Sequence, residues 1–124
     1  MPDPFVPVLY LKHNCPHCLK ARIFLLEADL LNRIDIREFV PGDPQEEAIR
    51  AELQPHFSKV TFPTLQYAPG QYMQDSDAII ARIAGERGID RAALPIFTTY
   101  ARSVLPKYMA ARQELKALKE QAPA

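Results

Sequence analysis

The sequence predicts an α/β domain with the element order β-α-β-α-β-β-α, followed by a C-terminal helical extension. Strand-like apolar runs alternate with segments of helical periodicity over roughly the first ninety residues. The chain has 124 residues and is 48% hydrophobic, which is enough to bury a single core without disulfide staples. Its two cysteines, Cys15 and Cys18, form a Cys-x-x-Cys pair between the first expected strand and the first expected helix.

The first two elements flank the cysteines. Residues 6–11 form a nearly continuous apolar run, which is typical of a strand buried on both faces of a mixed or parallel sheet. Residues 19–31 have helical periodicity. Apolar residues at helical spacing define the expected buried face of this helix: Leu19, Ile23, Leu26 and Leu30. Charged residues are expected on its solvent side: Lys20, Arg22 and Glu27.

Residues 34–40 predict the second strand. Alternation places one set of side chains on a common face of it: Ile34, Ile36 and Glu38. A second helix is expected from Pro44 to about Leu53. Asp43 is its expected N-cap, and Glu46 is expected to complete a capping box with Asp43.

Residues 61–67 and 72–73 predict the two strands of a hairpin, joined by a glycine-containing turn. The segment 75–77, Asp-Ser-Asp, then predicts the start of a third helix. Gly85 and Gly88 are expected to end that helix, because glycine readily takes the left-handed conformation of a C-cap.

The segment 94–124 carries a helical stripe of apolar side chains. Its members are Phe97, Tyr100, Ala101, Val104, Tyr108, Leu115 and Leu118. Pro106 predicts an interruption, with one helix to about Val104 and a second to about Gln121. Such a stripe usually packs on its own domain. The more specific alternative is that it forms an interface with a partner or with a second copy of the chain.

The cysteine pair has the pattern of a redox site. With Cys15 near the N-cap and Pro16 in the first turn, the Cys15 sulfur faces unpaired backbone N–H groups and the positive end of the helix dipole. Both favour a thiolate, which makes Cys15 the expected nucleophile. Cys18, one turn later, is placed to close a disulfide and to release a mixed-disulfide partner.

Two other interpretations of the pair exist. One is an inert buried pair, but Pro16 fixes a helix start that directs the first sulfur outward. Together with His13 and His17 the cysteines offer two thiolates and two imidazoles to zinc. Zinc sites of this type usually draw on two separated pairs, and the chain has no second Cys-x-x-Cys. We therefore expect no metal.

Charge and hydropathy exclude several classes of partner. Fifteen basic and fifteen acidic residues give a formal net charge of zero, and they are mixed along the chain, so neither a nucleic acid nor a membrane surface is an expected partner. No apolar run has transmembrane length. Residues 1–4 carry no basic region and do not resemble a secretory signal. We expect a reducing, cytoplasmic location, in which cysteines serve catalysis more often than structure.

The element order, with Cys-Pro-His-Cys at 15–18, resembles the thioredoxin superfamily, and most of all the glutaredoxins and the N-terminal domains of glutathione S-transferases. Thr61-Phe62-Pro63 is similar to the loop whose proline is cis in this superfamily, and residues 75–79 are similar to the acidic-Ser-x-Ala-Ile element of transferases. The resemblance covers residues 5–88. It implies a thioredoxin-like fold, a four-stranded mixed sheet flanked by helices, in residues 1–90, with residues 91–124 as an extension.

The resemblance implies a glutathione-linked thiol–disulfide oxidoreductase. Its partners would be glutathione, as cosubstrate, and protein thiols or disulfides; Cys15 would attack and Cys18 would resolve. Lys12 would pair with the glycyl carboxylate of glutathione, and the Phe62 backbone beside a cis Pro63 would pair with its cysteinyl unit. Ser76 and the start of the third helix would receive the γ-glutamyl carboxylate, and Asp75 or Asp77 would meet the amino group.

Plainer interpretations of these residues stay open at this point. Pro63 fits an ordinary strand start, Asp75 and Ser76 fit a plain helix cap, and Lys12 fits a solvated surface lysine. His17 stands where glutaredoxins commonly have tyrosine and is similar to the histidine of periplasmic oxidising enzymes. A protonated His17 would stabilise the thiolate and raise the reduction potential.

Two other functions remain alternatives. The first is a non-catalytic, transferase-like module that binds glutathione or a protein and acts through its C-terminal helices, for example as a homodimer. The second is a dimer that holds an iron–sulfur cluster through Cys15 and glutathione. Pro16 speaks against the second, because glutaredoxins that bind such clusters usually lack a proline there.

Overall fold

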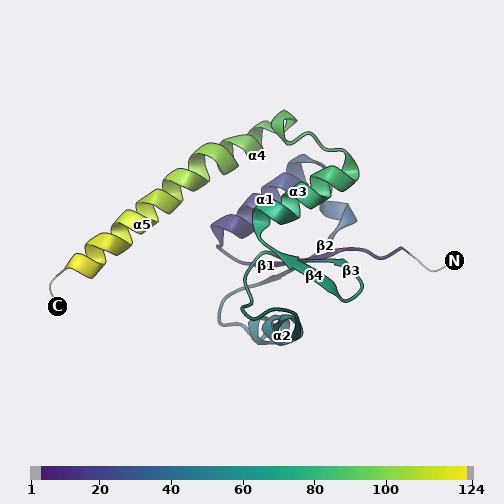
Figure 1. The fold of residues 1–124 in the computed structure, drawn as a ribbon, viewed down its shortest axis with the longest axis horizontal. Coiled ribbons are helices and arrows are strands. Elements are labelled where there is room, and N and C mark those ends of the chain that lie inside the picture. The colour runs from purple at the N-terminus through teal and green to yellow at the C-terminus, as the bar shows by residue number, and fades with distance from the viewer. Residues whose placement is uncertain (1–3, 123–124) are drawn as a thin grey trace.

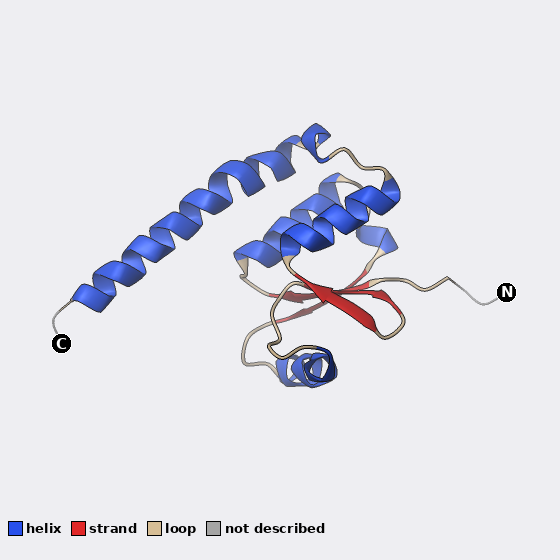
Figure 2. Cartoon of the chain, viewed as in Figure 1, coloured by secondary structure: helices blue, strands red, loops and turns tan. Residues whose placement is uncertain are grey.

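The computed structural model describes residues 4–122, which form one sheet with helices on both faces and a long C-terminal helix (Figures 1 and 2). The strands are β1 (Val8–Lys12), β2 (Asp35–Phe39), β3 (Thr64–Ala68) and β4 (Gln71–Gln74). The helices are α1 (Pro16–Glu27), α2 (Pro44–Leu53), α3 (Ser76–Arg87), α4 (Pro95–Thr99) and α5 (Leu105–Gln121). The predicted element order is confirmed.

The sheet is mixed, with the strand order β2-β1-β3-β4. β1 pairs with β2 in parallel and with β3 in antiparallel, and β3 and β4 form the predicted hairpin. At the centre of the ladder, Leu9 lies opposite Ile36 on one side and Leu65 on the other. The four-stranded mixed sheet implied by the resemblance is therefore present, and its central strand leads directly into the cysteine segment.

Two hydrophobic clusters cover the two faces of the sheet. Leu9 and Leu11 point into the larger cluster beneath α1 and α3, whereas Tyr10 points into a smaller one beneath α2. Figure 1 shows α1 and α3 over one face and α2 over the other. The prediction that the first strand is buried on both faces is confirmed, and the reason is this alternation of side chains between two cores.

The predicted buried face of the first helix is wrong. Leu19 and Leu26 are 48% and 64% exposed, whereas Phe24 and Leu25 are fully buried. Lys20, expected in solvent, is also buried. α1 packs against α3 and α4 as well as the sheet, so it buries more than one side. Since apolar residues occur all around this helix, its periodicity does not identify the buried stripe.

The helix ends differ from the predictions in detail. Asp43 is the N-cap of α2, but its side chain makes no capping bond, and Glu46 instead accepts a hydrogen bond from the backbone N–H of Gly42 at 2.8 Å. Asp75 caps α3 by accepting from the backbone N–H of Asp77 at 3.2 Å. Gly88, at φ 65°, is the C-cap of α3, whereas Gly85 lies inside that helix and does not end it.

The C-terminal helix changes its winding where the proline interruption was predicted. A π-helical turn, Tyr100–Val104, joins α4 to α5 without a loop. It ends two residues before Pro106, which has no N–H to donate and whose ring crowds the carbonyl four residues earlier, within this turn. A π-helical turn is one way in which a helix accommodates such a residue.

This extension is attached to α1. The carboxylate of Glu27 accepts the backbone N–H groups of Ile96 and Phe97 at 3.0 and 2.7 Å and so caps α4. The Phe97 ring packs edge-on against Phe24, with centroids 5.5 Å apart. Beyond Leu105, which is buried, α5 extends away from the body (Figure 1).

The apolar stripe of the extension therefore divides in two. Phe97 packs on the domain as expected, but Leu115 and Leu118 are 52% and 59% exposed. The expectation that the stripe packs on its own domain is wrong for this second half. Within residues 4–122, no helix combines the length and the apolar character that crossing a membrane requires.

Candidate functional site

The two cysteines occupy different positions on α1. Cys15 is the N-cap residue, with extended backbone angles, and is partly exposed. Cys18 lies one turn later, faces the core and is 3% exposed. Both are free thiols. Pro16 occupies the first turn of α1, as predicted, because its fixed φ suits a helix start and its missing N–H would be unpaired there in any case.

The two thiols have different pKa values because their surroundings differ. The pKa of Cys15 is lowered to about 5, mainly because the Cys18 thiol donates a hydrogen bond to it. Burial opposes this shift, while the backbone N–H groups of Cys18 and His17 and the charge of His17 support it. The pKa of Cys18 is raised by its hydrogen bond to Cys15 and by burial. Near neutral pH, Cys15 is a thiolate and Cys18 a thiol.

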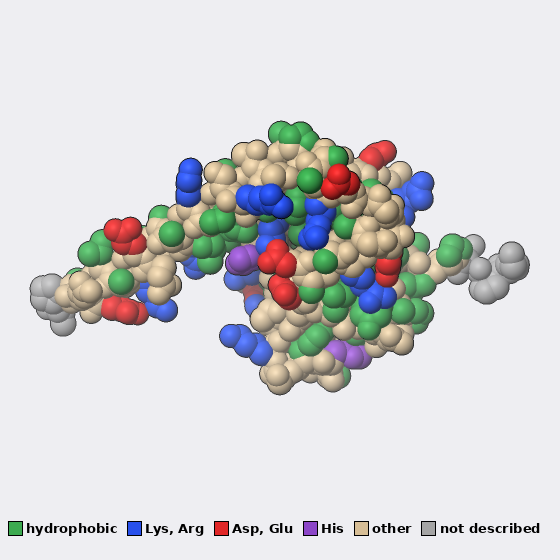
Figure 3. Space-filling model, turned by 45° about the horizontal axis from the view of Figure 1, so that its top comes forward, with side chains coloured by type: hydrophobic (Ala, Val, Ile, Leu, Met, Phe, Trp, Pro, Cys, Tyr) green, Lys and Arg blue, Asp and Glu red, His purple; other side chains and the backbone are tan. Residues whose placement is uncertain are grey.

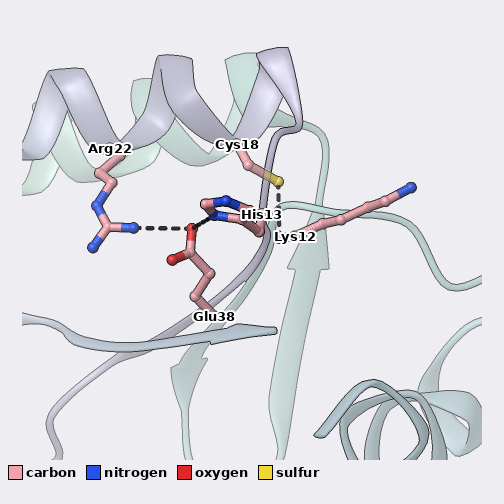
Figure 4. A network of polar contacts seen from close by, with 5 residues as sticks. All are labelled: Lys12, His13, Cys18, Arg22 and Glu38. Carbon is pink, nitrogen blue, oxygen red and sulfur yellow. Dashed lines mark hydrogen bonds and ion pairs between the residues drawn. The ribbon is translucent and has the colours of Figure 1, made fainter. Parts of the chain in front are cut away.

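The Cys18 sulfur is also fixed from the sheet. The backbone N–H of Lys12, at the end of β1, donates a hydrogen bond to Cys18 Sγ at 3.3 Å (Figure 4). The Lys12 side chain points away from that sulfur. The central strand thus supplies a contact that fixes the position of the second cysteine.

A cavity of about 460 Å³ opens beside the two sulfurs. Apolar and polar side chains from four parts of the chain line it: the end of β1 and the following loop, the first turns of α1, the end of β2 and the C-terminal helix. Figure 3 shows hydrophobic, basic, acidic and histidine side chains meeting where the C-terminal helix leaves the body. The cavity is large enough for a small peptide or a similar ligand.

One wall of the cavity is a polar network. Glu38 accepts a hydrogen bond from Arg22 at 3.0 Å, and its carboxylate lies 3.9 Å from His13 Nδ1 (Figure 4). From the sequence, His13 is a candidate only as a metal ligand, and Arg22 and Glu38 have no predicted function. The signals were present, because Arg22 follows Cys18 by one helical turn and Glu38 shares a strand face with Ile36.

Another part of the cavity lining comes from the C-terminal extension. Tyr100, Val104 and Tyr108 line the cavity, and the Tyr100 hydroxyl donates a hydrogen bond to the Pro16 carbonyl oxygen at 2.7 Å. Burial, and then the negative charge of Cys15, raise the pKa of Tyr100. From the sequence, these residues are predicted only as members of an apolar stripe. That they border the cysteines depends on the tertiary packing of α4 on α1.

The residues expected to hold glutathione fall into two groups. Lys12, like Cys15, lines the cavity. Phe62, Pro63, Asp75 and Ser76 are described in the structure and lie outside the lining of this cavity, as does His17. The assignment of these residues to glutathione remains a prediction.

The loop before β3 has the backbone geometry that the resemblance implied. The Phe62–Pro63 peptide bond is cis. Pro63 is fully buried, and the Phe62 ring packs edge-on against Phe39, with centroids 4.8 Å apart. The register of β3 with β1 begins at Thr64 opposite Tyr10, so the Phe62 backbone lies outside that ladder.

The start of α3 is already engaged within the protein. Asp75 caps the helix, Ser76 is buried, and Asp77 Oδ1 lies 2.6 Å from the Nζ atom of the buried Lys20. The plain helix-cap interpretation therefore describes Asp75 in this structure. Among residues 4–122, no group of three or more histidine, cysteine, aspartate or glutamate side chains is arranged to hold a metal ion.

Two comparisons with known proteins gave a match. The sequence profile of the glutathione S-transferase N-terminal domain matches residues 9–88. The crystal structure of glutathione transferase Omega 2C from Trametes versicolor is similar, with 19% sequence identity and a TM-score of 0.46. The match covers 77% of this chain but only 40% of that transferase. No curated protein sequence matches the chain.

Proposed function

Because the chain belongs to the glutathione S-transferase N-terminal domain family, we propose that it is a glutathione-linked thiol–disulfide oxidoreductase of the reducing cytoplasm. The observation that carries the proposal is the asymmetry of the two cysteines. Cys15 is partly exposed at the N-terminus of α1 and borders a cavity, while Cys18 is buried one turn behind it. This is the arrangement that an attacking thiolate and a resolving thiol require.

The proposed reaction consists of two thiol–disulfide exchanges. The Cys15 thiolate attacks the glutathione sulfur of a protein–glutathione mixed disulfide, and the substrate protein leaves as a thiolate that takes up a proton. Cys18 then loses its proton and attacks the Cys15 sulfur. Glutathione leaves, and a Cys15–Cys18 disulfide remains. Two further glutathione molecules reduce this disulfide and are themselves oxidised to glutathione disulfide.

The proposed glutathione site extends from the cavity toward the cis-proline loop. Lys12 would meet the glycyl carboxylate, and the Phe62 backbone before Pro63 would pair with the cysteinyl unit as a short added strand. Asp75 and Ser76 would receive the γ-glutamyl end at the start of α3. The Phe62 backbone is outside the sheet ladder, which supports this part of the proposal.

The test is a turnover assay. A glutathionylated peptide serves as substrate, and glutathione reductase with its nicotinamide cofactor reports the glutathione disulfide formed. The wild-type protein should turn over at millimolar glutathione, and Cys15→Ser should be inactive because the attacking thiolate is lost. A Leu26→Ser variant, altered at an exposed position of the same helix, is the matched control. No turnover by the wild-type protein would contradict the proposal.

A binding module is the second candidate, and one observation favours it. About half of each of three apolar side chains of α5 is exposed, those of Tyr108, Leu115 and Leu118, and a partner could cover this surface. In this alternative the chain catalyses no reaction and binds a partner through α5. A turnover that survives Leu115→Lys and Leu118→Lys but disappears in Cys15→Ser would favour the enzyme.

A further inference from the structure

The resolving step of the proposed oxidoreductase requires that Cys18 lose a proton, and the inference below rests on that function. Cys18 is 3% exposed, and its sulfur is held between Cys15 and the backbone N–H of Lys12. Its burial raises its pKa, and this cause persists when glutathione is attached to Cys15, so Cys18 enters the resolving step as a thiol. Only a thiolate attacks a disulfide efficiently. A group near Cys18 must therefore accept the proton.

The polar wall of the cavity holds a suitable set of side chains. His13, from the loop between β1 and α1, lines the same cavity as Cys18 and Glu38, and Figure 4 shows its ring beside the Glu38 carboxylate. His13 Nδ1 is 3.9 Å from Glu38 Oε2, and Arg22 holds the same oxygen at 3.0 Å. A thiol, an imidazole and a carboxylate thus line the same cavity, and an arginine holds the carboxylate.

We propose that His13, oriented by Glu38, accepts the proton of Cys18 in the resolving step. Imidazole is the side chain best suited to exchange protons near neutral pH. The Glu38 carboxylate, 3.9 Å from His13 Nδ1, attracts the positive charge that the ring gains with the proton. Glu38 and Arg22 are therefore positioning residues in this account, and His13 is the proton acceptor.

The step balances without a further reagent. The S–H bond of Cys18 breaks and its proton goes to His13. The Cys18 sulfur forms a bond with the Cys15 sulfur, and the bond between Cys15 and glutathione breaks. The glutathione thiolate leaves with the electron pair of that bond and takes a proton from the imidazolium or from water.

The other charged and titratable groups on the cavity are less suited to this task. They are Lys12 on β1, Cys15 and Arg22 on α1, Tyr100 on the π-helical turn and Tyr108 on α5. Lysine, arginine and tyrosine are protonated near neutral pH and cannot accept another proton there. Cys15 is itself the sulfur under attack. His13, 49% exposed, can return its proton to solvent after each cycle.

The test is a single-turnover experiment that separates the two exchanges. Reduced protein is mixed with glutathione disulfide, quenched with acid and analysed by mass spectrometry for the Cys15–glutathione adduct and the internal disulfide. In His13→Gln and Glu38→Gln the adduct should form at the wild-type rate. It should resolve about tenfold or more slowly near neutral pH, and the pH dependence of resolution should shift toward alkaline pH. Free imidazole should partly restore resolution in His13→Ala.

Glu52→Gln is the matched control. Glu52 pairs with Arg37 at 2.6 Å, is similarly exposed, and lies outside the lining of the cavity. This variant should resolve the adduct at the wild-type rate. If both His13→Gln and Glu38→Gln resolve the Cys15–glutathione adduct at the wild-type rate and with the wild-type pH profile, the inference fails and the proposed function still stands. If no adduct forms on Cys15 even in Cys18→Ser, the oxidoreductase function itself fails, and the inference with it.

Discussion

The Tyr100 hydroxyl donates a 2.7 Å hydrogen bond to the carbonyl oxygen of Pro16, the residue that follows Cys15 at the start of α1. The two residues are 84 positions apart in the chain. Through this bond the π-helical turn is fixed to the cysteine segment, and the extension becomes a wall of the cavity. The C-terminal segment is thus tied to the same helix that carries the two thiols.

Tyr100→Phe should destabilise the protein by about 1 kcal/mol, because it removes one hydrogen bond while keeping the ring. Tyr108→Phe, at a position that is 49% exposed, should change the free energy of unfolding by less than about 0.5 kcal/mol. Urea denaturation of the two variants and the wild type measures the difference. Equal stabilities for both variants would show that the Tyr100–Pro16 bond does not hold the extension in place.

Cys15 should react with iodoacetamide far faster than Cys18 at about pH 6.5, two units below the pKa of an ordinary cysteine. Cys15, with its pKa lowered to about 5, is already a thiolate there, whereas Cys18 is a buried thiol. Peptide mapping after timed alkylation gives both rates. Similar rates for the two cysteines would remove the assignment of Cys15 as nucleophile.

Cys18→Ala should raise the pKa of Cys15 more than His17→Tyr does. The hydrogen bond from the Cys18 thiol is the largest cause of the low Cys15 pKa, and the charge of His17 is the smallest of the causes identified. The pH dependence of the alkylation rate gives the pKa in each variant. A larger shift in His17→Tyr would mean that electrostatic stabilisation by histidine, the sequence-based expectation, is the dominant effect after all.

Asp77→Asn should destabilise the protein by about 1–3 kcal/mol, whereas Lys20→Met should be nearly neutral. The Lys20 side chain is 7% exposed and the Asp77 side chain is 81% exposed. Removing the carboxylate leaves a buried ammonium without its partner, while removing the ammonium leaves a carboxylate that water already solvates. Thermal unfolding of the two variants decides this, and an equal loss in both would contradict the account.

The sequence predicted the elements well because each has a strong local signal. The nearly continuous apolar run of β1, the proline at the start of α2 and the glycine turn of the hairpin all act within a few residues. The interruption before Pro106 was also predictable, because the missing N–H of proline disturbs any helix. What these signals leave open is which side of an element faces the core.

Two predictions from the sequence failed because they depend on how the elements pack: the buried face of α1 and the polar residues of the cavity. α1 has apolar residues on all sides, so Leu19 and Leu26 were assigned to the core in place of Phe24 and Leu25. The polar wall around Glu38 was missed because it joins α1, the loop after β1 and the end of β2, which meet only through the parallel pairing of β1 and β2. Such a constellation depends on long-range packing and leaves little trace in local sequence.

Trapping of glutathione on Cys18→Ser tests the central claim most directly. The reduced variant is incubated with glutathione disulfide, and intact-mass measurement with peptide mapping locates any adduct. If Cys15 is the attacking thiolate and Cys18 the resolving thiol, one glutathione should accumulate on Cys15 and persist, whereas the wild-type protein should pass on to the internal disulfide. A Cys18→Ser protein that stays unmodified, while its Cys15 alkylates no faster than a free cysteine, would contradict the oxidoreductase account.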